Sequence, residues 1–358
     1  MRHNREVTCR RSLGLLALAA IGLFAVLTVS RIAPASESSV AIDVQDSLQI
    51  PLEQRRRIAR GEVVSFPVTE NSEREIAAGL ALSLPAPATQ LAQYLSSGQL
   101  IAHDATIVDF GLVPSDAPSP LIGPAFSSSD RDEATSLLDA SPGTRFNLST
   151  AEIESLRSAR SGSGRDTLDL ASGAFRRLLS ERVQSYRQSG LGAIAPYARA
   201  GGAVSDPAVE LRLAIADAQR IGHPGAELHQ ALLHYPAEQP VQVTSQLYWV
   251  KRRVQRRPHL SLLHRMVTSD VGSTVHLERY FYSEHSFNSM VILTAAFPIQ
   301  EGTLLLASTR VSTDEILGVG SQLKRTVARG QMRDEMRTRL ERVRLSLSRP
   351  QPPAAESP

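Results

Sequence analysis

Five consecutive segments rich in β-branched and aromatic residues follow Pro240, and short turns separate them. The segments are 246–254, 259–267, 274–285, 289–299 and 303–311. Strands joined by such short turns pair in antiparallel orientation, because parallel pairs need a long crossover. A helical pattern then runs from about Ile316 to Leu347. The chain is therefore predicted to have an α+β fold, in which a curved antiparallel sheet packs on a long C-terminal helix.

The rest of the chain is expected to add strands to this sheet and to carry a block of helices. Residues 51–113 are predicted to hold the N-terminal strands and a helix of the same α+β domain. A Pro- and Ser-rich connection is expected at 114–148, and a helical insertion at 149–240. The meander and the C-terminal helix occupy 241–348, and 349–358 is predicted to be a disordered tail.

The first 35 residues have the layout of a secretory signal peptide. Four arginines between Arg2 and Arg11 precede an uncharged apolar run, Leu13 to Val29, and Ala33-Pro34-Ala35 follows as a cleavage site. The apolar run is long enough that an uncleaved N-terminal anchor is the alternative. Residues 36–50 are expected to be flexible. The protein is thus predicted to be exported to the periplasm or the extracellular space, or tethered to the inner membrane.

Export changes what the charge and the cysteine content imply. The full chain has 39 basic and 36 acidic residues, but residues 1–35 hold five arginines and one glutamate, so the remainder carries a net charge of −1. That balance gives no support to a nucleic-acid partner. The only cysteine, Cys9, lies in the same N-terminal segment. The exported chain therefore has no disulfide, thiolate metal ligand or cysteine nucleophile.

The segment 274–285 contains the stretch YFYSEHSF from Tyr280 to Phe287, an aromatic cluster in a chain with 5% aromatic residues. Strand alternation sends one set of side chains to one face: Val275, Leu277, Arg279, Phe281, Ser283 and His285. The other face receives His276, Glu278, Tyr280, Tyr282 and Glu284. An unpaired buried arginine is costly, so Arg279 is expected to pair with an acid, to reach the rim of the sheet, or to line a cavity with a polar end.

The cavity interpretation defines a ligand site. Arg279, His285 and Lys251 would hold a polar or anionic head, and apolar walls would come from Trp249, Phe281, Tyr282 and Phe287. His276-x-Glu278 places two ligand types on one strand face without an evident third, so we predict neither a metal site nor a cofactor. No catalytic residue is predicted, although a hydrolase using His285 with Asp314 or Glu284 is an alternative.

Several spaced residues resemble an uncharacterised family of exported bacterial proteins. They are Tyr248-Trp249-x-Lys251, Tyr282-x-x-His285-x-Phe287, Arg310-x-x-x-Asp314 and Gly320-x-x-x-Lys324-Arg325. The chain departs from that family at Ser286, where an aromatic is expected, and at Arg252, where an acid is expected. More distantly, the order of strand, Pro-led helix, meander and long C-terminal helix resembles the helix-grip fold of START-like lipid-binding domains, which would carry no insertion such as 149–240.

These observations favour a non-enzymatic module of the cell envelope that binds an apolar or lipid-like ligand between the sheet and the last helix. The second hypothesis is a protein-interaction or structural module that uses the helical insertion as its contact surface. The C-terminal helix has nine positive and three negative charges between Lys324 and Arg349. Contact with a membrane surface through this helix is therefore a further expectation.

Overall fold

The computed structural model describes residues 35–348, except for 103, 105, 116–120, 122–124, 162–165, 219–225, 238–241, 255 and 271–272. The expected signal peptide, apart from Ala35, and the expected tail at 349–358 lie outside the described residues. The described residues all belong to one compact unit. Because the whole described core belongs to this unit, we expect it to fold without residues 1–34.

Eight strands form a single antiparallel sheet in the order β1-β2-β10-β9-β8-β7-β6-β3. The strands are β1 (Val64–Phe66), β2 (Glu75–Leu84), β3 (Ile107–Val113), β6 (Val243–Val254), β7 (Arg257–Asp270), β8 (Ser273–Ser283), β9 (Ser289–Ile299) and β10 (Gly302–Ser312). Strands β6 to β10 are neighbours in the sheet in sequence order, which confirms the predicted meander. A separate hairpin pairs β4 (Tyr197–Ala198) with β5 (Val204–Ser205).

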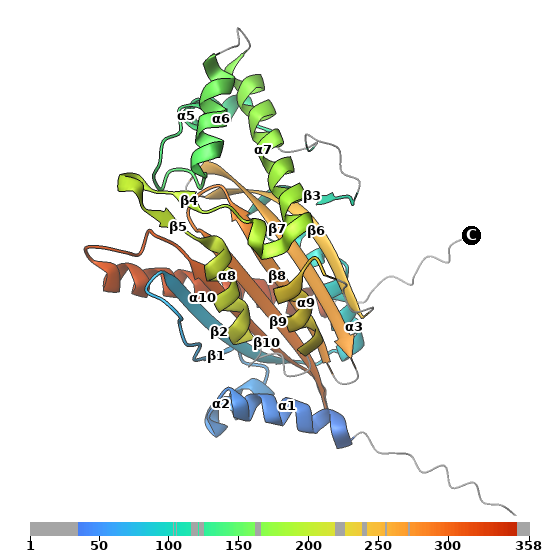
Figure 1. The fold of residues 1–358 in the computed structure, drawn as a ribbon. Coiled ribbons are helices and arrows are strands. Elements are labelled where there is room, and N and C mark those ends of the chain that lie inside the picture. The colour runs from blue at the N-terminus through green and yellow to red at the C-terminus, as the bar shows by residue number, and fades with distance from the viewer. Residues whose placement is uncertain are drawn as a thin grey trace, which may run out of the picture. The chain divides into compact units, whose positions relative to one another are not determined.

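Helices cover both faces of the large sheet (Figure 1). They are α1 (Ala35–Ser47), α2 (Leu52–Ala59), α3 (Ala88–Ser96), α4 (Gln99–Ala102), α5 (Arg131–Leu138), α6 (Thr150–Ser161), α7 (Thr167–Ser189), α8 (Pro207–Ala218), α9 (Ala226–His234) and α10 (Ser321–Leu347). Helices α7, α8 and α9 lie on one face, here called the insertion face, and α3 and α10 lie on the other, the α10 face. The predicted α+β fold with a C-terminal helix is confirmed.

Each face has its own apolar core. On the insertion face Leu277 and Phe297 pack with Leu179 of α7 and Leu211 of α8, and all four are fully buried. On the α10 face the core joins leucines of β2 and β10 to α3 and to the C-terminal half of α10. The insertion is therefore not a separate domain, because its helices bury the sheet and the sheet buries them.

Two expected irregular segments contain helices. Residues 36–50 were expected to be flexible, but they form most of α1, whose Ala41 and Val44 are buried in the core of the insertion face. The connection at 114–148 includes α5, whose Ala134 and Leu137 are fully buried. Composition was misleading here, because small and polar residues around a few apolar ones are enough for a helix that packs on one side.

A β-bulge interrupts β8 at Phe281. Leu262 and Leu263 of β7 lie opposite Tyr282 and Tyr280, so Phe281 is an extra residue without a partner. The extra residue reverses the alternation, and Phe281 and Tyr282 both join the core of the insertion face. The predicted division of these two aromatics between the faces is therefore wrong.

Phe281 is expected to be one of the most costly side chains to truncate. It is 2% exposed, and its ring stacks on that of Tyr186 of α7 with centroids 3.9 Å apart. Phe281→Ala should lower the free energy of unfolding by about 3–5 kcal/mol, because it leaves a cavity between sheet and insertion. Phe110→Ala on the edge strand β3, where the side chain is 38% exposed, is the matched control and should cost less than about 1 kcal/mol. Equal costs in urea unfolding would contradict this picture of the core.

Candidate functional site

The predicted ligand residues do not meet under the C-terminal helix. Arg279 lies on the insertion face together with Phe281, Tyr282, Trp249 and Lys251. Helix α10 packs on the opposite face, so the predicted pocket between Arg279 and α10 is wrong. The physical reason is that two separate layers seal this sheet, and the sequence alone does not say which layer meets which face.

Arg279 is fully buried and binds neutral groups of the insertion. Its Nη1 donates to the carbonyl of Leu232 in the last turn of α9, at 2.6 Å, and its Nη2 donates to the hydroxyl of Tyr186. No carboxylate pairs with it among the described residues. The carbonyl end of a helix carries partial negative charge, which stabilises the guanidinium. Arg279 therefore joins the sheet to two helices, α7 and α9.

His264 continues this hydrogen-bonded chain. Its Nδ1 accepts from Tyr186, at 2.8 Å, and from Arg279, at 3.2 Å, so its Nε2 carries the proton and donates to Ser245 at 2.7 Å. Burial, followed by the charge of Arg279, lowers the pKa of His264 well below its ordinary value. The imidazole is neutral, and Tyr235 packs edge-on against its ring.

Trp249 and Lys251 serve packing and pairing. Trp249 is 7% exposed and lies over Gly111 of β3, where an added Cβ would come within 2.5 Å of its indole nitrogen. Lys251 donates to the carbonyl of Ala125 at 2.8 Å and lies 3.5 Å from the buried carboxylate of Asp130. Neither side chain is hydrogen-bonded to Arg279 among the described residues.

His285 and Phe287 lie beyond the end of β8. The Nε2 of His285 donates to the carbonyl of Pro258 at 2.8 Å, and the hydroxyl of Ser286 donates to Nδ1 at 2.6 Å. Burial lowers the pKa of His285 to about 4. Phe287 packs instead with Tyr280, on the α10 face. Neither Glu284 nor Asp314 is hydrogen-bonded to His285 within the described part of the chain, so the triad of the hydrolase alternative is not assembled.

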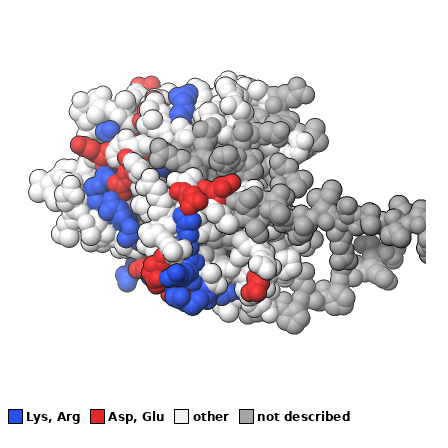
Figure 2. All heavy atoms as spheres, turned by 90° about the horizontal axis from the view of Figure 1, so that it is seen from below, with Lys and Arg blue, Asp and Glu red and all other residues white. Residues whose placement is uncertain are grey.

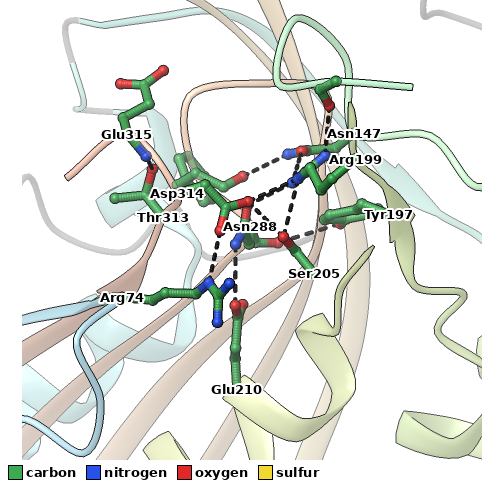
Figure 3. A network of polar contacts seen from close by, with 12 residues as sticks. Arg74, Asn147, Tyr197, Arg199, Ser205, Glu210, Asn288, Thr313, Asp314 and Glu315 are labelled. Atoms are coloured by element: carbon green, nitrogen blue, oxygen red, sulfur yellow. Dashed lines mark hydrogen bonds and ion pairs between the residues drawn. The ribbon is translucent and has the colours of Figure 1, made fainter. Parts of the chain in front are cut away.

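Asp314 is the centre of a polar network that locks the insertion onto the sheet (Figure 3). Its carboxylate accepts from Arg74 and Arg199, each at 2.8 Å, and from Ser205 at 2.5 Å. Arg199 also donates to Asn147 and Asn288, at 2.8 and 2.9 Å. These mutual bonds satisfy the carboxylate and the guanidinium of Arg199, so we interpret the network as structural.

A second buried charge lies on the α10 face. Glu278 is 1% exposed and accepts from Arg339 of α10 at 2.6 Å. Burial acts to raise the pKa of Glu278, but the charge of Arg339 outweighs it and the pKa is lowered. His276 is fully buried on the same face, and neither of its ring nitrogens has a hydrogen-bond partner among the described residues. Burial lowers the pKa of His276 to about 4, so the ring is neutral.

A cavity of about 20 Å³ lies between this face of the sheet, α3 and α10. Its lining is Leu95, Ile292, Thr294, Leu305, Ala307, Thr309, Met336, Arg339, Leu340 and Val343. His276 lies directly across the strand pair from Thr294. The walls are mainly apolar, and Thr294, Thr309 and Arg339 supply the polar groups. The volume itself has room for about one water molecule.

The sequence analysis identified neither Arg339 nor the threonines of the cavity. Arg339 reaches Glu278 from a helix that begins 43 residues later in the chain, so strand alternation gave no sign of the pair. The cavity threonines lie on β9 and β10, where alternation does assign them to the same face as His276. The signal was therefore present for the strand residues and absent for the helix residue.

Comparison with known proteins found nothing similar to this chain. Neither the known protein families, the curated proteins nor the solved structures gave a match. In the described ranges, no three or more His, Cys, Asp or Glu side chains are grouped so that they could hold a metal ion. The helices of the same ranges include none that is long and apolar enough to cross a membrane. Both resemblances stay predictions.

Glu284 is expected to make the stability of the folded protein depend on pH. It is 1% exposed, and its Oε2 accepts from the backbone N–H of Leu260 at 2.9 Å, while Oε1 has no hydrogen-bond partner in the part of the chain that the structure describes. Burial raises its pKa to about 8, so the folded protein holds a proton that the unfolded chain releases above its ordinary pKa of 4.5. Stability from this group is therefore full below pH 4.5 and is lost as the pH rises towards 8.

Glu284→Gln should abolish that loss. Between pH 5 and pH 8, the free energy of unfolding of the wild type relative to the variant should fall by up to about 1.4 kcal/mol per pH unit. The buried histidines have the opposite pH dependence, but they are common to both proteins and cancel in the difference. Glu154→Gln, at an exposed position of α6, is the matched control and should follow the wild type. Parallel wild-type and Glu284→Gln curves in urea unfolding would show that Glu284 is ionised when folded.

Proposed function

We propose that this protein is an exported, non-enzymatic binding module that takes a small apolar molecule with a neutral polar end between the sheet and α10. The observation that carries the proposal is the mainly apolar cavity whose lining residue Thr294 lies across the strand pair from His276, an imidazole without a hydrogen-bond partner among the described residues. It lies between the sheet and the C-terminal helix, where the resemblance to START-like domains led us to expect a ligand.

The chemistry of the walls supports a neutral ligand. The charge of Arg339 is balanced by Glu278, and His276 is neutral, so a carboxylate entering the site would lack a compensating charge. A hydroxyl or carbonyl could instead bond to the hydroxyls of Thr294 and Thr309, which both line the cavity. This differs from the anionic head group expected from Arg279.

Ligand entry requires α10 to move, because the cavity has room for only about one water molecule. Of the 27 residues in α10, those that are buried are Met336, Leu340 and Val343, and all three line the cavity. Outward displacement of the C-terminal half of α10 would enlarge this space and leave the core of the insertion face in place. The displacement must be small enough to keep Arg339, which lies in the same half, paired with Glu278.

The alternative, a protein-interaction or structural module that uses the insertion as its contact surface, receives less support. Its helices bury Leu262, Leu277 and Phe297 of the sheet, which are fully buried. Removing 149–235 would expose this face to water, so the deletion is expected to unfold the sheet. Deleting the insertion is therefore not a usable way to separate ligand binding from a contact role of the insertion.

The proposal is tested with decanol and decanoate as probes on the unit 35–358. Isothermal titration calorimetry should detect decanol, with decanoate at least about tenfold weaker, because the net-neutral site does not compensate a buried carboxylate. Ala307→Val should block the cavity and abolish decanol binding. Thr294→Val should weaken decanol about tenfold by removing one hydroxyl.

Thr268→Val is the matched control, because Thr268 is buried on β7 and is absent from the cavity lining. It should bind decanol like the wild type. Circular dichroism melting confirms that each variant is folded. Equal decanol binding by wild type and Ala307→Val would place the ligand elsewhere. An absence of decanol binding, together with no copurifying ligand in native mass spectrometry, would reject the binding function.

A further inference from the structure

Ser286 lies in the short connection between β8 and β9 with its backbone in a strained conformation. Its φ is +68°, a left-handed value that residues other than glycine rarely adopt. The hydroxyl of Thr313 donates to the carbonyl of Ser286 at 2.9 Å, and the N–H of Phe287 donates to that of His285 at 2.8 Å, so two hydrogen bonds hold this turn. Ser286 is partly exposed. Backbone strain that the surrounding structure maintains gathers at functional sites, so this serine is a candidate for chemistry.

His285 meets this serine as a hydrogen-bond acceptor. Its Nε2 lies 2.8 Å from the carbonyl oxygen of Pro258, which can only accept, so Nε2 carries the proton of the neutral ring. Nδ1 is therefore unprotonated, and the hydroxyl of Ser286 donates to it at 2.6 Å. The Pro258 carbonyl thus fixes the tautomer of the imidazole, which is the role of the third member of a catalytic triad. This arrangement differs from the alternative with Glu284 or Asp314, because its orienting group is a backbone carbonyl.

The surroundings of His285 keep its ring neutral. Burial is the main reason that the pKa of His285 is lowered to about 4. Nδ1 is therefore ready to accept a proton throughout the neutral pH range. It is a weak base, so the reaction it assists needs a good leaving group, such as that of an activated ester or a thioester. The titratable and charged side chains that face the ring are Arg257 and His259 of β7, Glu133 of α5 and Arg145.

Other serines that bond to histidine in the described part of the chain lack this combination. Ser245 is exposed, but His264 donates to it through Nε2, so that imidazole cannot take its proton. Ser261 and Ser283 both contact His259, and all three are fully buried, where no ester reaches them. On the face shown in Figure 2 the described basic and acidic side chains are interleaved, so charge does not single out a competing ligand site there.

We propose that Ser286 is a nucleophilic serine that takes the acyl group of an activated ester or thioester. Its Oγ attacks the carbonyl carbon while its proton passes to Nδ1 of His285. The bond from that carbon to the leaving oxygen or sulfur then breaks, and the leaving group takes the proton. The products are an O-acyl serine and a free alcohol or thiol. The backbone N–H of Ser286 donates to no group among the described residues, which leaves it available to the oxyanion. The step modifies the protein itself, and it is independent of the cavity and of the binding function proposed above.

The test uses p-nitrophenyl acetate as the probe on the unit 35–358, with the acetylated peptides quantified by mass spectrometry. At pH 7, Ser286 should be acetylated at least about a hundredfold faster than Ser245 in the same protein, because only Ser286 has a general base. His285→Gln should lower the rate at Ser286 by at least about a hundredfold. Lys251 and Lys324 are the only lysines of the chain, so few amines compete for the reagent.

The pH dependence of the wild type needs no substitution. Because Nδ1 of His285 is already unprotonated, the rate at Ser286 should change by less than about twofold between pH 6 and pH 8, whereas a serine that reacts as its alkoxide gains about tenfold per pH unit. Ser245→Ala is the matched control variant and should be acetylated at Ser286 like the wild type.

Three results would overturn the proposal: equal rates at Ser286 and Ser245, a rate at Ser286 that rises about tenfold per pH unit, or a wild-type rate in His285→Gln. Circular dichroism checks that His285→Gln is folded. If it is not, the comparison of the two serines in the wild type and the pH profile at Ser286 decide the question.

Discussion

Burial of β8 on both faces is the constraint on which the rest of the structure depends. Every residue of this strand is buried, and it carries Glu278 next to Arg279. Adjacent strand residues point to opposite faces, so the two charges cannot neutralise each other. Each needs its own partner from the layer that covers its face. Arg339 of α10 supplies one, and the carbonyl end of α9 with Tyr186 of α7 supplies the other.

This constraint explains why neither helical layer is an accessory. Without the insertion, Arg279 would be exposed together with the leucines of the sheet, and without α10, Glu278 would lose its cation. Removing one partner of a buried ion pair costs more than replacing both partners by apolar residues, because the remaining charge is buried without compensation. The polar network around Asp314 lies at the edge of the same interface. Its hydrogen bonds join the insertion to the loops that follow β8 and β10.

The sequence was sufficient for the architecture and insufficient for the site. Alternation and short turns predicted β6 to β10, and the last helix was expected within a few residues of its start at Ser321. The sequence also indicated that Arg279, if buried, needs a partner for its charge. The partner lies in the segment 226–234, and such a non-local contact leaves no periodic trace. The bulge at Phe281 was equally hidden, since an extra residue is visible only when the register with β7 is known.

The two ends of α10 are held in different ways. Arg325 and Arg329 tie its first turns to Glu70, whereas Met336, Leu340 and Val343 in its last turns pack on the sheet and line the cavity. Arg339 lies among these three residues and pairs with Glu278. The same half of α10 therefore closes the cavity and supplies the cation that the buried carboxylate of Glu278 needs.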